Sequence, residues 1–135
     1  MIKKIKLQAI LDNYQKFMDF LQKQTDRSRV NSDIVSDIMI AGEEVVVNVM
    51  HYAYPDKKGD LEVSFERKED LVRIIFADSG KPFNPFEKQE PDINKPVEDR
   101  EIGGLGILLV KKLMDGADYG YRENKNVLTI VKKIS

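Results

Sequence analysis

Residues 32–54, SDIVSDIMIAGEEVVVNVMHYAY, carry apolar side chains at helical spacing. Ser32 is a suitable N-cap and Pro55 stops the pattern, so we expect a helix from about Ser32 to Tyr54. At 100° per residue, the apolar side chains gather on one face of this helix. They are Ile34, Ile38, Ala41, Val45, Val49 and Tyr52. This face predicts that the helix packs along its length on a hydrophobic core.

Two polar residues lie on the flank of that apolar face. Relative to Ile34, Glu44 and Asn48 fall at roughly 280° and 320° around the helix. The neighbouring Glu43 falls near 180°, on the solvent side. Glu44 and Asn48 are four residues apart and share one face, and their oxygens suit a magnesium ion and an activated nucleophile. A solvated polar edge of an ordinary amphipathic helix is the alternative.

A second candidate follows the apolar segment 71–77, which predicts a strand. Asp78 comes directly after this segment, and Gly80 follows two residues later. A carboxylate at a strand end can accept a hydrogen bond from an exocyclic amine such as that of adenine. A glycine lets the backbone approach a ring closely. The alternative is an ordinary turn, because Asp, Ser and Gly are turn formers.

A third candidate is the glycine-rich stretch 103–106, GGLG, before a helix expected over residues 107–114. Bare backbone amides at a helix N-terminus favour phosphate binding. The stretch is not a P-loop, because no Gly-Lys-Ser/Thr follows. It also follows a charged loop rather than a strand, unlike a dinucleotide fingerprint. Close helix packing is the alternative explanation for these glycines.

The remaining sequence predicts an α/β domain. We expect an edge strand over 2–7, a first helix over 10–24, and strands over 61–65, 119–122 and 127–132. The loop 79–102 holds four of the five prolines. A loop of this length is usually a functional lid or a surface insertion.

Composition narrows the function classes. The 135 residues predict a single domain, 1–135, and 22 basic against 23 acidic residues argue against nonspecific nucleic-acid binding. The absence of cysteine excludes a disulfide scaffold, a thiolate zinc site and a cysteine nucleophile. The single histidine leaves no two-histidine metal site. No stretch approaches a membrane span or a signal peptide, so we expect a cytoplasmic protein.

The order of the three candidates resembles the GHKL ATPase superfamily. Residues 41–48 with 53–54 look like the N box of the bacterial anti-sigma-factor serine kinases. Residues 78–85 look like that subfamily's G1 box, and residues 103–115 look like its G2 box with the helix behind it. The resemblance implies a Bergerat-type two-layer α/β sandwich. Its sheet would be mixed and mostly antiparallel, with helices on one face.

The resemblance also implies roles for single residues. Asn48 would bind the Mg2+ that bridges the phosphates of ATP, and Glu44 would be the general base. Asp78 would accept a hydrogen bond from the adenine amine, with Gly80 giving the base room. The other implied nucleotide-binding residues are Arg100 near the terminal phosphate, Gly104, Leu105 and Gly106 at the phosphates, and Thr129 beside the adenine.

The function implied is an ATP-dependent serine/threonine protein kinase that doubles as an anti-sigma factor. Its implied partners are a sigma factor and an anti-sigma-factor antagonist, which it would phosphorylate, and the resemblance also implies a homodimer. A nucleotide-gated binding protein with little or no phosphotransfer is the alternative, because ATP could order the lid and complete a partner surface.

Overall fold

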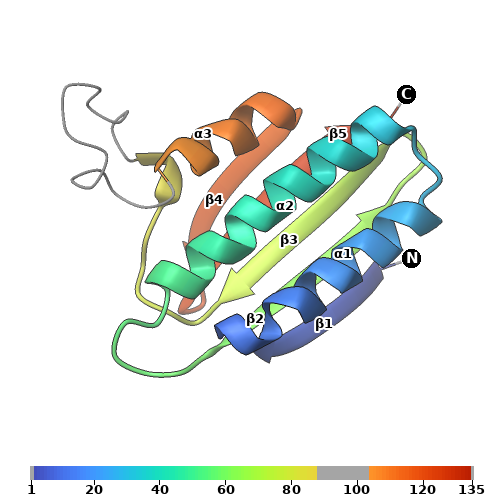
Figure 1. Cartoon of the computed structure of the whole chain (residues 1–135). Coiled ribbons are helices and arrows are strands. Elements are labelled where there is room, and N and C mark those ends of the chain that lie inside the picture. The colour runs from blue at the N-terminus through green and yellow to red at the C-terminus, as the bar shows by residue number, and fades with distance from the viewer. Residues whose placement is uncertain (1, 88–103, 135) are drawn as a thin grey trace.

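The computed structural model describes residues 2–87 and 104–134. They form a five-stranded sheet in the order β1-β2-β3-β5-β4, in which each pair of neighbouring strands is antiparallel (Figure 1). The strands are β1 (Ile2–Gln8), β2 (Asp60–Arg67), β3 (Leu71–Asp78), β4 (Gly116–Arg122) and β5 (Lys125–Lys133). The predicted edge position of the first strand is confirmed, whereas the expected parallel component of the sheet does not occur among these strands.

The helices lie together on one face of the sheet, with α2 between α1 and α3 (Figure 1). They are α1 (Tyr14–Arg27), α2 (Ser32–Tyr52) and α3 (Gly104–Leu113), with the short 3-10 turns η1 (Leu11–Asn13) and η2 (Pro85–Glu87). The predicted two-layer α/β sandwich is therefore confirmed. Among the described residues, none of the helices combines the length and the apolar character that a membrane span requires.

The boundaries of α2 differ slightly from the prediction. Its N-cap is Asn31 rather than Ser32, because the Asn31 side chain accepts a hydrogen bond from the Ile34 amide at 3.0 Å. Asparagine is at least as good a cap as serine, so the shift by one residue agrees with cap preferences. The helix ends at Tyr52 with Ala53 as its C-cap.

The core lies between the helices and the sheet. Alternate side chains of the central strands are buried there, among them Val63, Phe65, Val72, Ile74, Phe76, Leu128 and Ile130. The predicted apolar face of α2 meets them, since Ile38, Ala41 and Val45 are buried. Each large apolar side chain buried in this way stabilises the fold by about 1.5–3 kcal/mol. This packing fixes the rotation of α2 about its axis, and with it the direction of the polar flank.

One ion pair joins the sheet to the layer of helices. The Lys132 ammonium lies 3.0 Å from the Asp37 carboxylate and donates to the Leu113 carbonyl at 2.7 Å. It therefore connects β5 to the first half of α2 and to the end of α3. A cation at the C-terminus of a helix also complements the helix dipole.

Candidate nucleotide site

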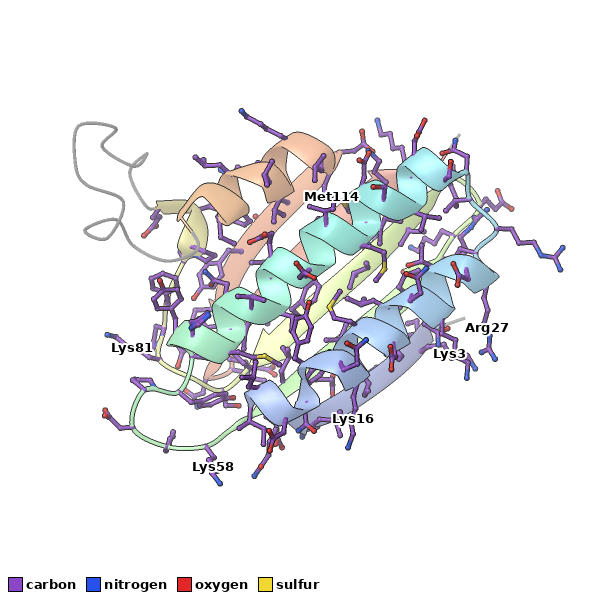
Figure 2. The ribbon with its side chains drawn as sticks, in the orientation of Figure 1. Lys3, Lys16, Arg27, Lys58, Lys81 and Met114 are labelled. Atoms are coloured by element: carbon purple, nitrogen blue, oxygen red, sulfur yellow. The ribbon has the colours of Figure 1, made fainter. Side chains whose placement is uncertain are left out.

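A pocket opens at the C-terminal end of α2, where this helix meets the end of β3 and the hairpin of β4 and β5. Lys81 marks this end of the molecule in Figure 2. The pocket is lined by Val45, Asn48, Val49, Tyr52, Ala53, Phe76, Asp78, Lys81, Phe83, Pro85, Tyr119, Asn126 and Leu128. The structure thus brings the predicted residues Asn48 and Asp78 to one pocket, although they come from different layers of the fold.

Asp78 ends β3 with its side chain 6% exposed. The carboxylate oxygen Oδ1 accepts hydrogen bonds from the Gly80 amide and from the Asn126 side-chain nitrogen, each at 2.9 Å. Burial raises the pKa of Asp78 above its usual value, while the hydrogen bonds from Asn126 and Gly80 oppose that rise. The result is a buried hydrogen-bond acceptor held in a fixed orientation at the pocket.

Asn48 lies on the pocket side of α2 and is 8% exposed. Its side-chain nitrogen is buried and has no hydrogen-bond partner among the residues that the structure describes. An unpaired buried polar group costs about 1–3 kcal/mol, so such groups call for a specific explanation. A ligand that binds in the pocket and pairs with this nitrogen would explain its position.

Glu44 lies one turn before Asn48 and faces the start of α3. A Cβ atom added to Gly106 would lie 1.8 Å from the Glu44 carboxylate oxygen Oε2, so the glycine is what lets this carboxylate fit against α3. Burial raises the pKa of Glu44, and the negative charge of Glu43 raises it further. A carboxylate with a raised pKa beside a glycine-rich helix start suits a general base.

The two adjacent glutamates differ, as the helical periodicity predicts. Glu43 is exposed, whereas Glu44 is partly buried. Glu43 accepts a hydrogen bond from the Tyr14 hydroxyl of α1 at 2.5 Å. This hydrogen bond raises the pKa of Tyr14 to about 12, with burial and the charge of Glu43 adding to it. The exposed glutamate is thus bound to α1, on the other side of α2 from the carboxylate at Gly106.

Gly80 is packed against the end of α2. A Cβ atom at this position would lie 2.2 Å from the Ala53 carbonyl oxygen, and the next amide, of Lys81, donates to that oxygen at 2.9 Å. Only a glycine permits this crossing of β3 and α2 without displacing the backbone. Helix packing is therefore a sufficient reason for the glycine, and its predicted closeness to a purine ring stays a prediction.

Sequence reasoning missed Asn126, which is buried at the start of β5. Its side-chain nitrogen donates to Asp78 and to the Lys81 carbonyl at 3.0 Å, and its oxygen accepts from the Phe83 amide at 3.1 Å. The Tyr119 hydroxyl also bonds to this oxygen. Strand alternation was the available signal, because Asn126 shares its face of β5 with the apolar Leu128 and Ile130.

The Phe83 side chain is one of the groups that line this pocket. Its ring stacks on Tyr52 with the centroids 5.5 Å apart and the ring planes at 21°. The remaining cavity measures about 30 Å3, room for about two water molecules. This enclosed volume is smaller than a purine, and Phe83 is one of the residues that line it.

The comparisons with known proteins agree with this geometry. Residues 7–132 match the histidine kinase-like ATPase domain family. The chain belongs to this family. The expected α/β fold of these ATPases is also seen in the catalytic domain of histidine kinase ThkA in a nucleotide-free form. That structure aligns with a TM-score of 0.55 at 18% identity, over 96% of this chain and 98% of the other.

Relatives with higher sequence identity to this chain are named as kinases. The serine-protein kinase RsbW of Bacillus cereus is 37% identical over 100 residues, which are 71% of this chain and 62% of the relative. RsbW of Halalkalibacterium halodurans is 35% identical over 105 residues, which are 75% and 63% of the two chains. The chain therefore spans less than two thirds of the length of these relatives.

The same fold is seen in a further solved structure. The RsbU and RsbW domains of Rv1364c from Mycobacterium tuberculosis align with a TM-score of 0.71 at 16% identity. The alignment covers 99% of this chain and 32% of the other chain. At this identity the likeness shows the fold alone.

The other predicted site residues lie elsewhere or outside the described residues. Thr129 lies on the opposite face of β5 from Asn126 and the pocket, so the structure does not bring it to Asp78. Gly104 begins α3, and Leu105 and Gly106 follow in its first turn. Arg100 and Gly103 lie outside the described residues.

Proposed function

We propose that the chain is an ATP-dependent serine/threonine protein kinase that acts as an anti-sigma factor and phosphorylates an anti-sigma-factor antagonist. The observation that carries the proposal is the meeting of three groups at one end of the sandwich. These are the Glu44 carboxylate against Gly106, the Asn48 side-chain nitrogen one turn later, unpaired among the described residues, and the buried acceptor Asp78.

The proposed site divides the nucleotide between two regions. Asp78 would accept a hydrogen bond from the exocyclic amine of adenine, in the pocket between α2 and β3. The start of α3, with Gly104, Leu105 and Gly106, would direct backbone amides at the phosphates. Arg100 stays in the proposal as a contact to the terminal phosphate, whereas Thr129 does not, because it lies on the other face of the sheet.

The donor set fits a magnesium ion. Mg2+ usually takes one or two protein oxygen ligands and completes its shell with phosphates and water. Asn48 would offer its side-chain oxygen to the ion, while its buried nitrogen, which has no partner among the described residues, would donate to the nucleotide or to a water in the pocket. When bound, the ion would neutralise charge on the phosphates, which is a large part of phosphoryl-transfer catalysis.

Glu44 would supply the proton acceptor. Its carboxylate lies beside the first turn of α3, where the phosphates would bind, and its partly buried position raises its pKa. A serine hydroxyl from the antagonist would approach this carboxylate, which would orient it and take its proton. Phosphoryl transfer depends mostly on such positioning together with charge stabilisation.

The relatives supply the substrate class. Two proteins with 35–37% identity over most of this chain are named serine-protein kinase RsbW. Serine phosphorylation, the antagonist as substrate, the sigma factor as a binding partner and a homodimeric state are all parts of our proposal for this chain. No described feature supports contact with nucleic acid or membrane.

Glu44→Gln tests the catalytic part of the proposal. The variant keeps the size of the side chain but cannot accept a proton, so it should bind ATP with nearly unchanged affinity. Its rate of serine phosphorylation on a candidate antagonist should fall by about a hundredfold or more. Glu43→Gln is the matched control, because Glu43 is exposed and bonded to Tyr14, and it should keep phosphotransfer within a few-fold. A Glu44→Gln enzyme with the wild-type rate contradicts the proposal.

One observation favours the alternative, a nucleotide-gated binding protein. Phe83 stacks on Tyr52 and leaves a cavity of only about 30 Å3 where the purine would bind. Nucleotide entry would therefore rearrange residues 81–85 and could alter a partner surface without any chemistry. ATP binding with no phosphorylation of any candidate partner would decide for this alternative.

A further inference from the structure

We propose that Asn126 is a positioning residue that makes the purine site selective for 6-amino over 6-oxo purines, by holding Asp78 as a hydrogen-bond acceptor. The inference rests on the proposed nucleotide function and adds a residue that none of the three sequence motifs contains. It starts from the hydrogen bonds of one buried carboxamide.

Hydrogen bonds at both the oxygen and the nitrogen fix the orientation of the Asn126 carboxamide. Its oxygen accepts from the backbone amide of Phe83, a group that can only donate. Its nitrogen lies 3.0 Å from the Lys81 carbonyl and 3.4 Å from the Gly80 carbonyl, groups that can only accept. A rotated carboxamide would break all of these bonds, so the nitrogen must face Asp78.

This orientation sets the state of Asp78. The Asn126 nitrogen and the Gly80 amide both donate to the same oxygen, Oδ1, of Asp78. Donors of this kind stabilise the ionised carboxylate and oppose the effect of burial. The second oxygen, Oδ2, is then left as an acceptor for a ligand in the pocket.

An acceptor at this place discriminates between purines. The 6-amino group of adenine can donate to it, whereas the 6-oxo group of hypoxanthine or guanine presents a lone pair and is repelled. A protonated Asp78 would reverse this preference, because its hydroxyl could donate to a 6-oxo group. Without the Asn126 donor, burial favours that protonated form.

The experiment compares ATP with inosine triphosphate, which differs in presenting a 6-oxo group. Dissociation constants for both are measured by calorimetry with Mg2+ for the wild type, Asn126→Leu and Asn126→Thr. The wild type should prefer ATP, and Asn126→Leu should reduce the ratio of the two constants by about tenfold or more. Asn126→Thr should restore part of the ratio, because its hydroxyl can still donate to Asp78.

The control is Val127→Thr, which lies one residue along on the opposite face of β5 and should keep the wild-type ratio. If Asn126→Leu does not fold, Asn126→Ala carries the same prediction. Equal weakening of both nucleotides, with an unchanged ratio, assigns Asn126 a structural role and overturns the inference alone. A wild type that binds ATP and inosine triphosphate equally overturns it as well. A wild type that binds neither contradicts the proposed function and the inference with it.

Discussion

Asp78 is the single residue on which the proposed recognition of the base depends. Burial disfavours its charged form, while Asn126 and the Gly80 amide favour that form. Its pKa stays raised above the usual value of an aspartate, so burial has the larger effect. The ionised form of a buried carboxylate is destabilising, a feature of the kind that proteins retain for function.

The prediction at this scale concerns Asp78→Asn. The stabilising effect of the raised pKa is present below pH 3.8 and is lost as pH rises through the raised value, so above that value the ionised group destabilises the fold. A neutral asparagine should therefore leave the Tm at pH 7 unchanged or higher. ATP affinity should fall by about tenfold or more, because a buried charge-assisted hydrogen bond is worth about 1.5–3 kcal/mol.

Calorimetry and a thermal melt on the same preparation check both parts of this prediction. A melt repeated at pH 4 should narrow the difference in Tm between the two proteins, since wild-type Asp78 then approaches its neutral form. Unchanged ATP affinity in Asp78→Asn would rule out the role assigned to the carboxylate.

Single-residue roles were predictable from sequence where a helix period applied. The 100° rotation per residue placed Glu44 and Asn48 on the flank of the apolar face and Glu43 on the solvent side, and the structure agrees, with Asn48 at the pocket and Glu44 against Gly106. The alternation of side chains along β5 was not used in the same way. Thr129 was matched to a family position, while the period of two puts Asn126 on the pocket face.

Among the elements, the segment between β3 and η2 decides access to the pocket. Its backbone is bound at Lys81 to α2 and at Phe83 to Asn126. The Phe83 ring rests on Tyr52 and occupies the space beside Asp78. If the proposed purine site displaces this ring, nucleotide binding has to break an aromatic contact worth about 0.5–1.5 kcal/mol.

Phe83→Ala should remove this obstruction. We expect ATP to bind about two- to tenfold more tightly, with most of the gain in the association rate, because the aromatic contact no longer has to be broken. Stopped-flow binding of a fluorescent ATP analogue measures the rate. Phe86→Ala is the control, because Phe86 packs on the Lys111 ammonium, 4.8 Å from the ring centroid, rather than on Tyr52. Weaker binding by Phe83→Ala would instead identify the ring as a platform for the base.

Element type was predictable throughout the described chain, but some boundaries and pairings were not. Asn31 and Ser32 are both good N-caps, and only the packing of α2 selects between them. The expectation of a mixed, mostly antiparallel sheet came from the family resemblance, because no local feature of a strand determines which neighbour it pairs with. Strand order depends on contacts that are distant in sequence.

At the scale of the whole molecule, the site exists only because three distant segments converge. Asn48 is in α2, Asp78 ends β3, and Gly106 is in the first turn of α3, which packs on α2. The core holds these elements in register, and Lys132 secures the far ends of α2 and α3. The order of the three motifs along the sequence indicated that they belong to one site. How close together they lie could be learned only from the folded structure.

The most direct test is a calorimetric titration of the wild type and Asn48→Ala with ATP and ADP, with and without Mg2+. The account predicts one nucleotide bound per chain. It also predicts that Mg2+ strengthens ATP binding to the wild type and has little effect on Asn48→Ala, because the variant lacks the proposed ligand. Equal losses of affinity with and without Mg2+ would remove Asn48 from the metal site. Failure of the wild type to bind either nucleotide under any of these conditions would contradict the account as a whole.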